Sequence, residues 1–141
     1  MKITHSVLCV LAAFALVGSP TSHAAEAAPV AAEKDQKVTW VFDIKEDKEA
    51  TPRGKVSLSV NGKQTVILAE AVGNYAVIES ATYKDKKIPA KALTACGGWW
   101  AGSGEDFYVL GEKGKLTVYQ RTVDEQGGNG KYKLVKTIPL P

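Results

Sequence analysis

The chain has almost no histidine and almost no cysteine. Its 141 residues contain two of each, and both histidines, His5 and His23, lie within the first 24 residues. If that segment is removed, no side chain with an ordinary pKa near neutrality remains. This excludes Ser-His-Asp and Cys-His catalytic systems and histidine zinc sites from the rest of the chain. We therefore expect a protein that is not an enzyme and holds no metal or other cofactor.

The first 24 residues have the pattern of a secretory signal peptide. Lys2 gives a positive end, residues 7–17 form an apolar run, and small residues precede a cleavage position at Ala24. A membrane-spanning helix needs about 20 apolar residues. Cys9 lies inside the apolar run, whereas a lipid-modified cysteine would follow it. We expect cleavage after Ala24, a periplasmic location and no membrane anchor.

One cysteine, Cys96, remains after that cleavage. A single cysteine cannot form an internal disulfide, so in an oxidising compartment it is either buried or paired with a second chain. Burial is common for free cysteines. We expect a buried thiol, with pairing in a homodimer as the alternative.

Neither sign of charge dominates the sequence. There are 18 Lys and Arg residues against 15 Asp and Glu residues, for a net charge of +3. The densest basic run, residues 84–87, contains Asp85, which is typical of a solvated turn. We expect no nucleic-acid binding.

The signal is followed by a leader and then by one domain. Residues 25–36, AEAAPVAAEKDQ, have no aromatic side chain and no apolar periodicity, which predicts a flexible segment. Residues 37–141 have the length of a single domain that can bury a core without disulfides.

This domain shows the alternation of β-strands. In residues 37–45 the side chains of one face are all apolar: Val38, Trp40, Phe42 and Ile44. Asn61-Gly62 favours a type I′ hairpin turn between residues 54–60 and 63–71. Further strand-like runs occupy residues 74–83, 105–111, 114–125 and 130–138, and a turn is expected at 90–94. The sequence predicts an all-β fold, an antiparallel sandwich or small barrel of about six to eight strands.

The segment CGGWWAGSGEDFYVLG, residues 96–111, differs from the rest of the chain. Ser103 has no histidine partner, and no helix follows the glycines to bind a phosphate. Glu105 and Asp106 are adjacent, so in a strand they point to opposite faces and cannot flank one sugar bond. A carboxylate pair of Glu105 with Glu79 or Glu112 remains open.

Two interpretations of the glycines compete. In one, residues 97–98 and 102–104 form ordinary turns, with Trp99 and Trp100 pointing one inward and one outward. In the other, the excess of glycine beside aromatic residues marks a contact surface, because loops and aromatic side chains carry much of protein recognition.

A family resemblance favours the contact surface. Ser103-Gly104, two residues and Phe107 resemble the Ser-Gly-x-x-Tyr loop of bacterial periplasmic lysozyme inhibitors. The length, the signal, the Ala/Pro-rich leader and the AGSGEDFYVLG segment resemble more closely the periplasmic inhibitors of invertebrate-type lysozyme. The resemblance implies a β-sandwich whose loop enters the lysozyme cleft at the catalytic carboxylates. Such an inhibitor protects the peptidoglycan of the producing cell from a host lysozyme.

The resemblance predicts a lysozyme-binding loop formed by Gly102, Ser103, Gly104, Glu105, Asp106, Phe107 and Tyr108. Phe107 replaces the tyrosine of the family pattern, and strand alternation sends either Phe107 or Tyr108 inward. We expect Phe107 in the core, with Ser103 and Tyr108 contacting the enzyme. The alternative is a periplasmic carbohydrate-binding module that uses Trp99, Trp100 and Tyr108 as a platform for peptidoglycan sugars.

Overall fold

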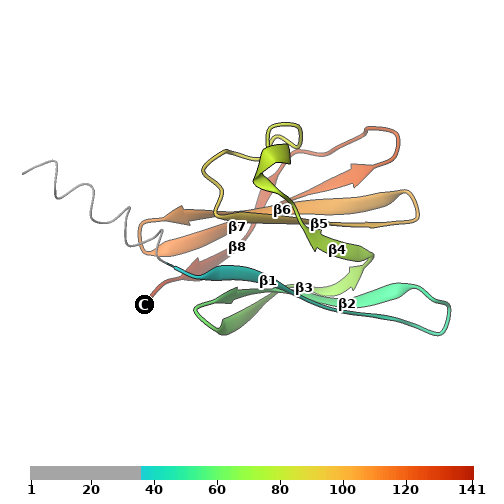
Figure 1. Cartoon of the computed structure of the whole chain (residues 1–141), viewed down its shortest axis with the longest axis horizontal. Helices are drawn as coiled ribbons and strands as arrows, with labels where there is room; N and C mark the ends of the chain where they lie inside the picture. The colour runs from blue at the N-terminus through green and yellow to red at the C-terminus, as the bar shows by residue number, and fades with distance from the viewer. Residues whose placement is uncertain (1–35) are drawn as a thin grey trace, which may run out of the picture.

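The computed structural model describes residues 36–141, so the expected signal peptide and all but the last residue of the expected leader lie outside the described residues. Two antiparallel sheets stack face to face (Figure 1). The smaller sheet contains β1 (Val38–Glu46), β2 (Pro52–Val60) and β3 (Lys63–Val72). The larger contains β4 (Asn74–Val77), β5 (Thr94–Trp100), β6 (Ser103–Glu112), β7 (Lys115–Asp124) and β8 (Lys133–Pro139). The predicted all-β sandwich is confirmed.

Within each sheet, every strand pairs with its neighbours in the sequence. The order is β1-β2-β3 in one sheet and β4-β5-β6-β7-β8 in the other. The chain crosses between the sheets at Gly73, whose φ is 134°. A Cβ there would lie 3.1 Å from the backbone of Trp99, so a residue without a side chain lets the crossover pass close to β5.

The core forms between the sheets from side chains that alternate along each strand. Trp40 packs on Phe107 with ring centroids 5.9 Å apart, and Leu58 and Leu116 are fully buried beside them. Cys96 is also fully buried, as expected of the remaining cysteine. Burial, and secondarily the charge of nearby Asp106, raises the pKa of its thiol. We call the core side of the larger sheet its inner face and the opposite side its outer face.

The predicted Asn-Gly hairpin turn is present between β2 and β3. Asn61 and Gly62 both have positive φ, at 52° and 91°, as a type I′ turn requires. The Asn61 side chain also accepts a hydrogen bond from the backbone N–H of Lys37 at 3.0 Å. The turn therefore fixes both the β2–β3 register and the start of β1.

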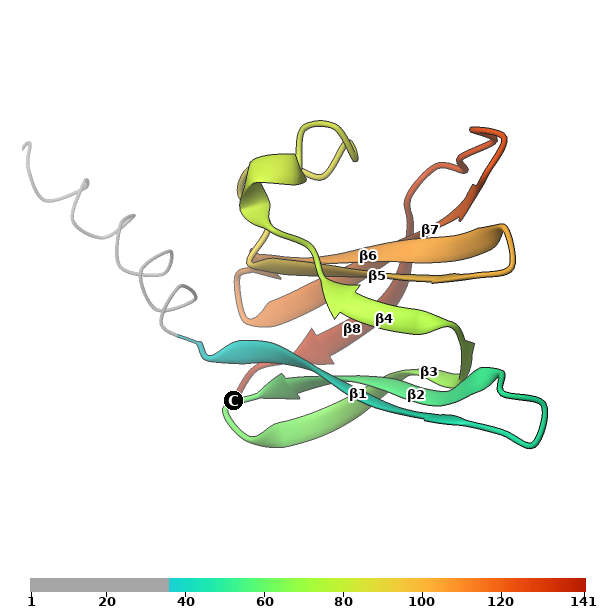
Figure 2. The same cartoon turned by 45° about the vertical axis from the view of Figure 1, so that its right-hand side comes forward.

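The segment after β4 differs from the long strand expected at residues 74–83. Ile78 makes one more backbone hydrogen bond, to Ala95, and a 3₁₀ helix, η1 (Ser80–Thr82), follows. Figures 1 and 2 show this segment rising over the outer face of the larger sheet. There it buries Tyr83 and Ile88, which explains why the chain leaves the sheet. Within residues 36–141, no helix is long and apolar enough to cross a membrane.

Candidate functional site

The segment that stands out in the sequence forms the β5–β6 hairpin. Its turn is two residues long, Ala101 and Gly102, with φ of 52° and 87°. Trp100 pairs with Ser103 across this turn. Of the expected binding loop, only Gly102 lies in the turn, and residues 103–108 begin β6. Most of the expected binding loop is therefore strand, because the segment is paired in register on both sides.

One of the two interpretations of the glycines has Gly97 and Gly98 turn the chain, but they lie in the middle of β5. A Cβ on Gly97 would lie 2.6 Å from Oδ1 of Asp106, on the outer face. A Cβ on Gly98 would overlap the ring of Tyr75 on the inner face. These glycines leave room for side chains packed over β5, a known use of glycine inside strands.

Strand alternation sorts the expected site residues between the two faces. Phe107 lies on the inner face with 1% of its surface exposed, which confirms its expected place in the core. Glu105 shares that face and accepts a 2.6 Å hydrogen bond from Nε2 of Gln120. Asp106 and Tyr108 point to the outer face and are also buried. Three consecutive residues of the expected loop are therefore covered in the folded chain.

Tyr108 was expected to contact the enzyme, but its ring is covered in the folded chain. Only 8% of its surface is exposed. The ring stacks on Tyr119 with centroids 4.9 Å apart and meets Tyr132 edge-on at 4.7 Å. Burial, and secondarily the neighbouring Tyr119, raises the pKa of Tyr108. The outward direction was foreseen, but the cover supplied by the β7–β8 connection was not.

The two tryptophans remain accessible. Trp99 is 43% exposed and Trp100 is 37% exposed, and as neighbours in one strand they point to opposite faces. A single sugar platform of Trp99, Trp100 and Tyr108 is therefore excluded by geometry. We call the group formed by residues 100–103 the hairpin tip. Figure 1 shows this turn at the end of the molecule away from the C-terminus.

The hairpin tip is held by the neighbouring β7–β8 connection. The backbone N–H of Glu125 donates to the carbonyl of Gly102 at 3.0 Å. Trp100 and the exposed Ser103 belong to the inner face. They line a cavity of about 560 Å³ together with Val72, Glu105 and Thr122. The tip thus combines a fixed backbone with an aromatic ring, a hydroxyl group and an open hollow.

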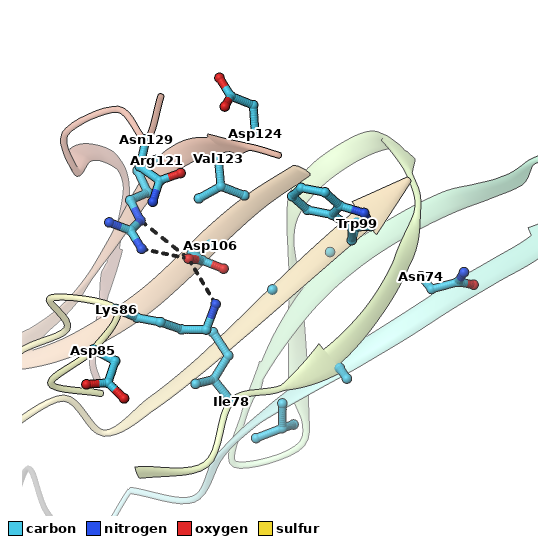
Figure 3. Close-up of a pocket in the computed structure, with 14 residues that line it drawn as sticks. Asn74, Ile78, Asp85, Lys86, Trp99, Asp106, Arg121, Val123, Asp124 and Asn129 are labelled. Atoms are coloured by element: carbon cyan, nitrogen blue, oxygen red, sulfur yellow. Dashed lines mark hydrogen bonds and ion pairs between the residues drawn. The ribbon is translucent and has the colours of Figure 1, made fainter. Parts of the chain in front are cut away.

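A second cavity, of about 450 Å³, lies on the outer face, with Asp106 at its centre (Figure 3). Oδ2 of Asp106 accepts hydrogen bonds from Nη2 of Arg121 at 3.1 Å and from Nε at 3.3 Å. Nζ of Lys86 lies 3.5 Å from the same oxygen. The Asp106 and Arg121 side chains are 4% and 6% exposed, and that of Lys86 is 41% exposed. Trp99 stands at the side of this cavity.

The sequence interpretation missed this charged group. Lys86 was assigned to a solvated turn, and Arg121 was not singled out. The sequence could have predicted the Asp106–Arg121 contact, because a two-residue turn between β6 and β7 pairs Glu112 with Lys115. Counting back from that pair sets Asp106 opposite Arg121, the register observed. The contact of Lys86 could not be found this way, since it depends on the irregular segment after β4.

The open carboxylate pair of Glu105 and Glu112 is not a catalytic pair. Glu112 lies seven positions after Glu105 in β6, about 23 Å away at the rise of a strand, whereas glycosidase carboxylates lie within about 10 Å. Glu112 instead pairs with Lys115 at 3.5 Å. In the part of the chain that is described, no group of three or more acidic, cysteine or histidine side chains could hold a metal ion.

No protein-family model matches this chain, and comparison with curated proteins and with solved structures finds no significant match.

Proposed function

We propose that this chain inhibits an invertebrate-type lysozyme and that the hairpin tip enters the cleft of the enzyme. The observation that carries this proposal is the exposure of Trp100 and Ser103 on either side of a two-residue turn. Tryptophan is enriched among the residues that dominate binding at protein interfaces. The family resemblance supplies the partner, and the geometry of the tip supplies a means of binding it.

The chemistry of the inner side of the tip suits a lysozyme cleft. Such a cleft contains a carboxylic acid with a raised pKa and a second carboxylate. The Ser103 hydroxyl is a neutral donor that can bind either group without adding charge. The Trp100 ring can fill a sugar subsite with large apolar area and few rotamers to order.

The backbone of the tip favours binding because it is already ordered. Its turn is closed by strand pairing, and Glu125 holds Gly102 from outside the hairpin. A preorganised segment loses little conformational entropy on association. In this proposal Trp100, Gly102 and Ser103 contact the enzyme, while the buried Asp106, Phe107 and Tyr108 support the hairpin.

The proposal includes export of the chain to the periplasm, where an inhibitor would protect peptidoglycan from a host lysozyme. Intact-mass measurement of the periplasmic protein should give a chain that begins at Ala25. Recovery of the full-length chain from the membrane fraction would contradict export with cleavage.

The direct test is inhibition of a panel of chicken-, goose- and invertebrate-type lysozymes by the purified chain. We expect inhibition of the invertebrate-type enzyme. Trp100→Ala and Ser103→Ala should each weaken it by about 1–3 kcal/mol, the scale of a lost aromatic anchor or buried hydrogen bond. Their melting temperatures should change little, because both side chains are exposed in the free protein.

Leu134→Ala is a matched control, because Leu134 is a large apolar residue that is 54% exposed on β8. It should inhibit as the parent chain does. Equal inhibition by all three variants would place the contact elsewhere on the molecule. Failure of the parent chain to inhibit any enzyme of the panel would refute the proposed function.

A further inference from the structure

The outer-face cavity contains the buried carboxylate of Asp106, of which only one oxygen is bonded to other residues that the structure describes. All three charged contacts of Asp106 are made to Oδ2. Oδ1 accepts no hydrogen bond from any of residues 36–141. Figure 3 shows this second oxygen directed away from Arg121, on the side of the cavity where Trp99 stands. An acceptor on a 96% buried side chain thus faces an open hollow.

The floor of the cavity is shaped to leave that oxygen accessible. Gly97 lies directly beneath it, and a Cβ at this position would come within 2.6 Å of Oδ1. The cavity volume, about 450 Å³, is within the range of roughly 300–1,000 Å³ typical of small-molecule sites. Its wall combines the apolar surface of Trp99 with the amides of Asn74 and Asn129.

The charges around the cavity favour a neutral ligand. Two cations, Lys86 and Arg121, meet the carboxylate of Asp106, so a cationic ligand would add a third positive charge to one acceptor. Asp85 and Asp124 also line the cavity, which disfavours an anion. Asp124 is itself engaged by the backbone N–H groups of Gln126 and Gly128.

We propose that this cavity binds the ring of a neutral sugar. A sugar hydroxyl can donate to Oδ1 of Asp106, and a neighbouring hydroxyl can accept from Nζ of Lys86, because each hydroxyl both donates and accepts. The apolar face of the ring packs on Trp99, and the amide of Asn129 can bind a further hydroxyl. This site is separate from the proposed lysozyme contact, because Trp99 and Trp100 face opposite sides of β5.

The test is titration of the purified chain with glucose, N-acetylglucosamine and their β-1,4-linked trimers, followed by tryptophan fluorescence and calorimetry. Arginine and inorganic phosphate serve as cationic and anionic probes. We expect at least one saccharide to bind with a Kd of about 1 mM or below. Trp99→Ala should weaken that binding about tenfold or more, while Trp100→Ala, its equally exposed neighbour, should leave it unchanged.

Two further measurements examine the carboxylate. Lys86→Gln removes a charged donor from a partly exposed position, so it should weaken sugar binding several-fold without unfolding the chain. In NMR spectra of isotope-labelled protein, the signals of the Trp99 indole and of Arg121 Nε should shift when the saccharide is added. The proposal is overturned if no saccharide binds at about 10 mM, if only arginine or phosphate binds, or if Trp100→Ala causes the larger loss. None of these outcomes depends on lysozyme inhibition.

Discussion

The two faces of the larger sheet differ in the side chains that they bury. The inner face is apolar and meets the smaller sheet through fully buried side chains such as Phe107, Val109 and Leu116. The outer face has a tyrosine-rich cluster next to a buried ion pair that lines a cavity, and the guanidinium of Arg121 lies 4.8 Å from the centroid of the Tyr132 ring of that cluster. Burial of an ion pair contributes little net stability, since desolvation offsets most of the attraction. The comparison indicates that the inner face supplies most of the core, whereas the outer face buries polar and charged side chains that add less to stability.

The largest difference in stability between the two faces should come from truncating the adjacent aromatic residues Phe107 and Tyr108. Phe107→Ala should lower the free energy of unfolding by about 3–5 kcal/mol, because it opens a cavity at the centre of the core. Tyr108→Ala should cost about 2–3 kcal/mol, since its ring is covered only by the outer cluster. Urea denaturation measures both changes. A larger loss for Tyr108→Ala would reverse the assignment of the main core.

Substitutions in the buried Asp106–Arg121 ion pair test how much the outer face contributes to stability. Asp106→Asn should cost about 3 kcal/mol, because it leaves the Arg121 charge buried without its counter-charge. The double variant Asp106→Leu with Arg121→Met should be more stable than the single variant, since it removes both charges. Equal stabilities in chemical denaturation would indicate that solvent already screens Arg121.

Local periodicity predicted the features that depend only on neighbouring residues. The alternation of β1, the Asn61-Gly62 turn and the inward direction of Phe107 all follow from a few adjacent side chains. The burial of Cys96 agreed with the general behaviour of free cysteines. These predictions required no knowledge of how distant segments meet.

The errors arose where distant segments decide the outcome. Gly97 and Gly98 resemble turn residues until Asp106 and Tyr75 are placed over them. Tyr108 resembles a surface ring until Tyr132, from the β7–β8 connection, covers it. The candidate site also depends on contacts between distant segments, so the sequence predicted only some of its residues.

Alkaline pH should weaken the fold through buried side chains of both faces. Burial raises the pKa of Tyr83, Tyr108 and Tyr132 near the outer face and of Cys96 on the inner face. Below about pH 7.5 both the folded and unfolded chains keep these protons, so stability is unaffected; the unfolded chain first loses the Cys96 proton, from about pH 8, and the tyrosine protons from about pH 9. At higher pH the unfolded chain releases protons that the folded chain retains, and the free energy of unfolding falls. Each such group contributes up to about 1.4 kcal/mol per pH unit.

Denaturation between pH 8 and 11 measures this slope. Tyr108→Phe removes one titrating group from the outer cluster while keeping the packed ring, so its slope should be shallower than that of the parent chain. An identical slope in the variant would mean that Tyr108 titrates alike in the folded and unfolded chains.

The smallest expected effect concerns the turn that joins the two strands at the tip. Ala101 adopts a φ of 52°, which costs a residue with a Cβ about 1 kcal/mol, and asparagine tolerates this region better. Ala101→Asn should therefore stabilise the chain by about 0.5–1 kcal/mol, whereas Ala101→Gly should gain less because glycine also makes the unfolded chain more flexible.

The reciprocal change, Asn61→Ala in the β2–β3 turn, should destabilise by more than Ala101→Asn stabilises, since it also removes the hydrogen bond to Lys37. Thermal denaturation of the three variants tests this order, and destabilisation by Ala101→Asn would show that the turn requires the small side chain of alanine rather than a tolerance of positive φ.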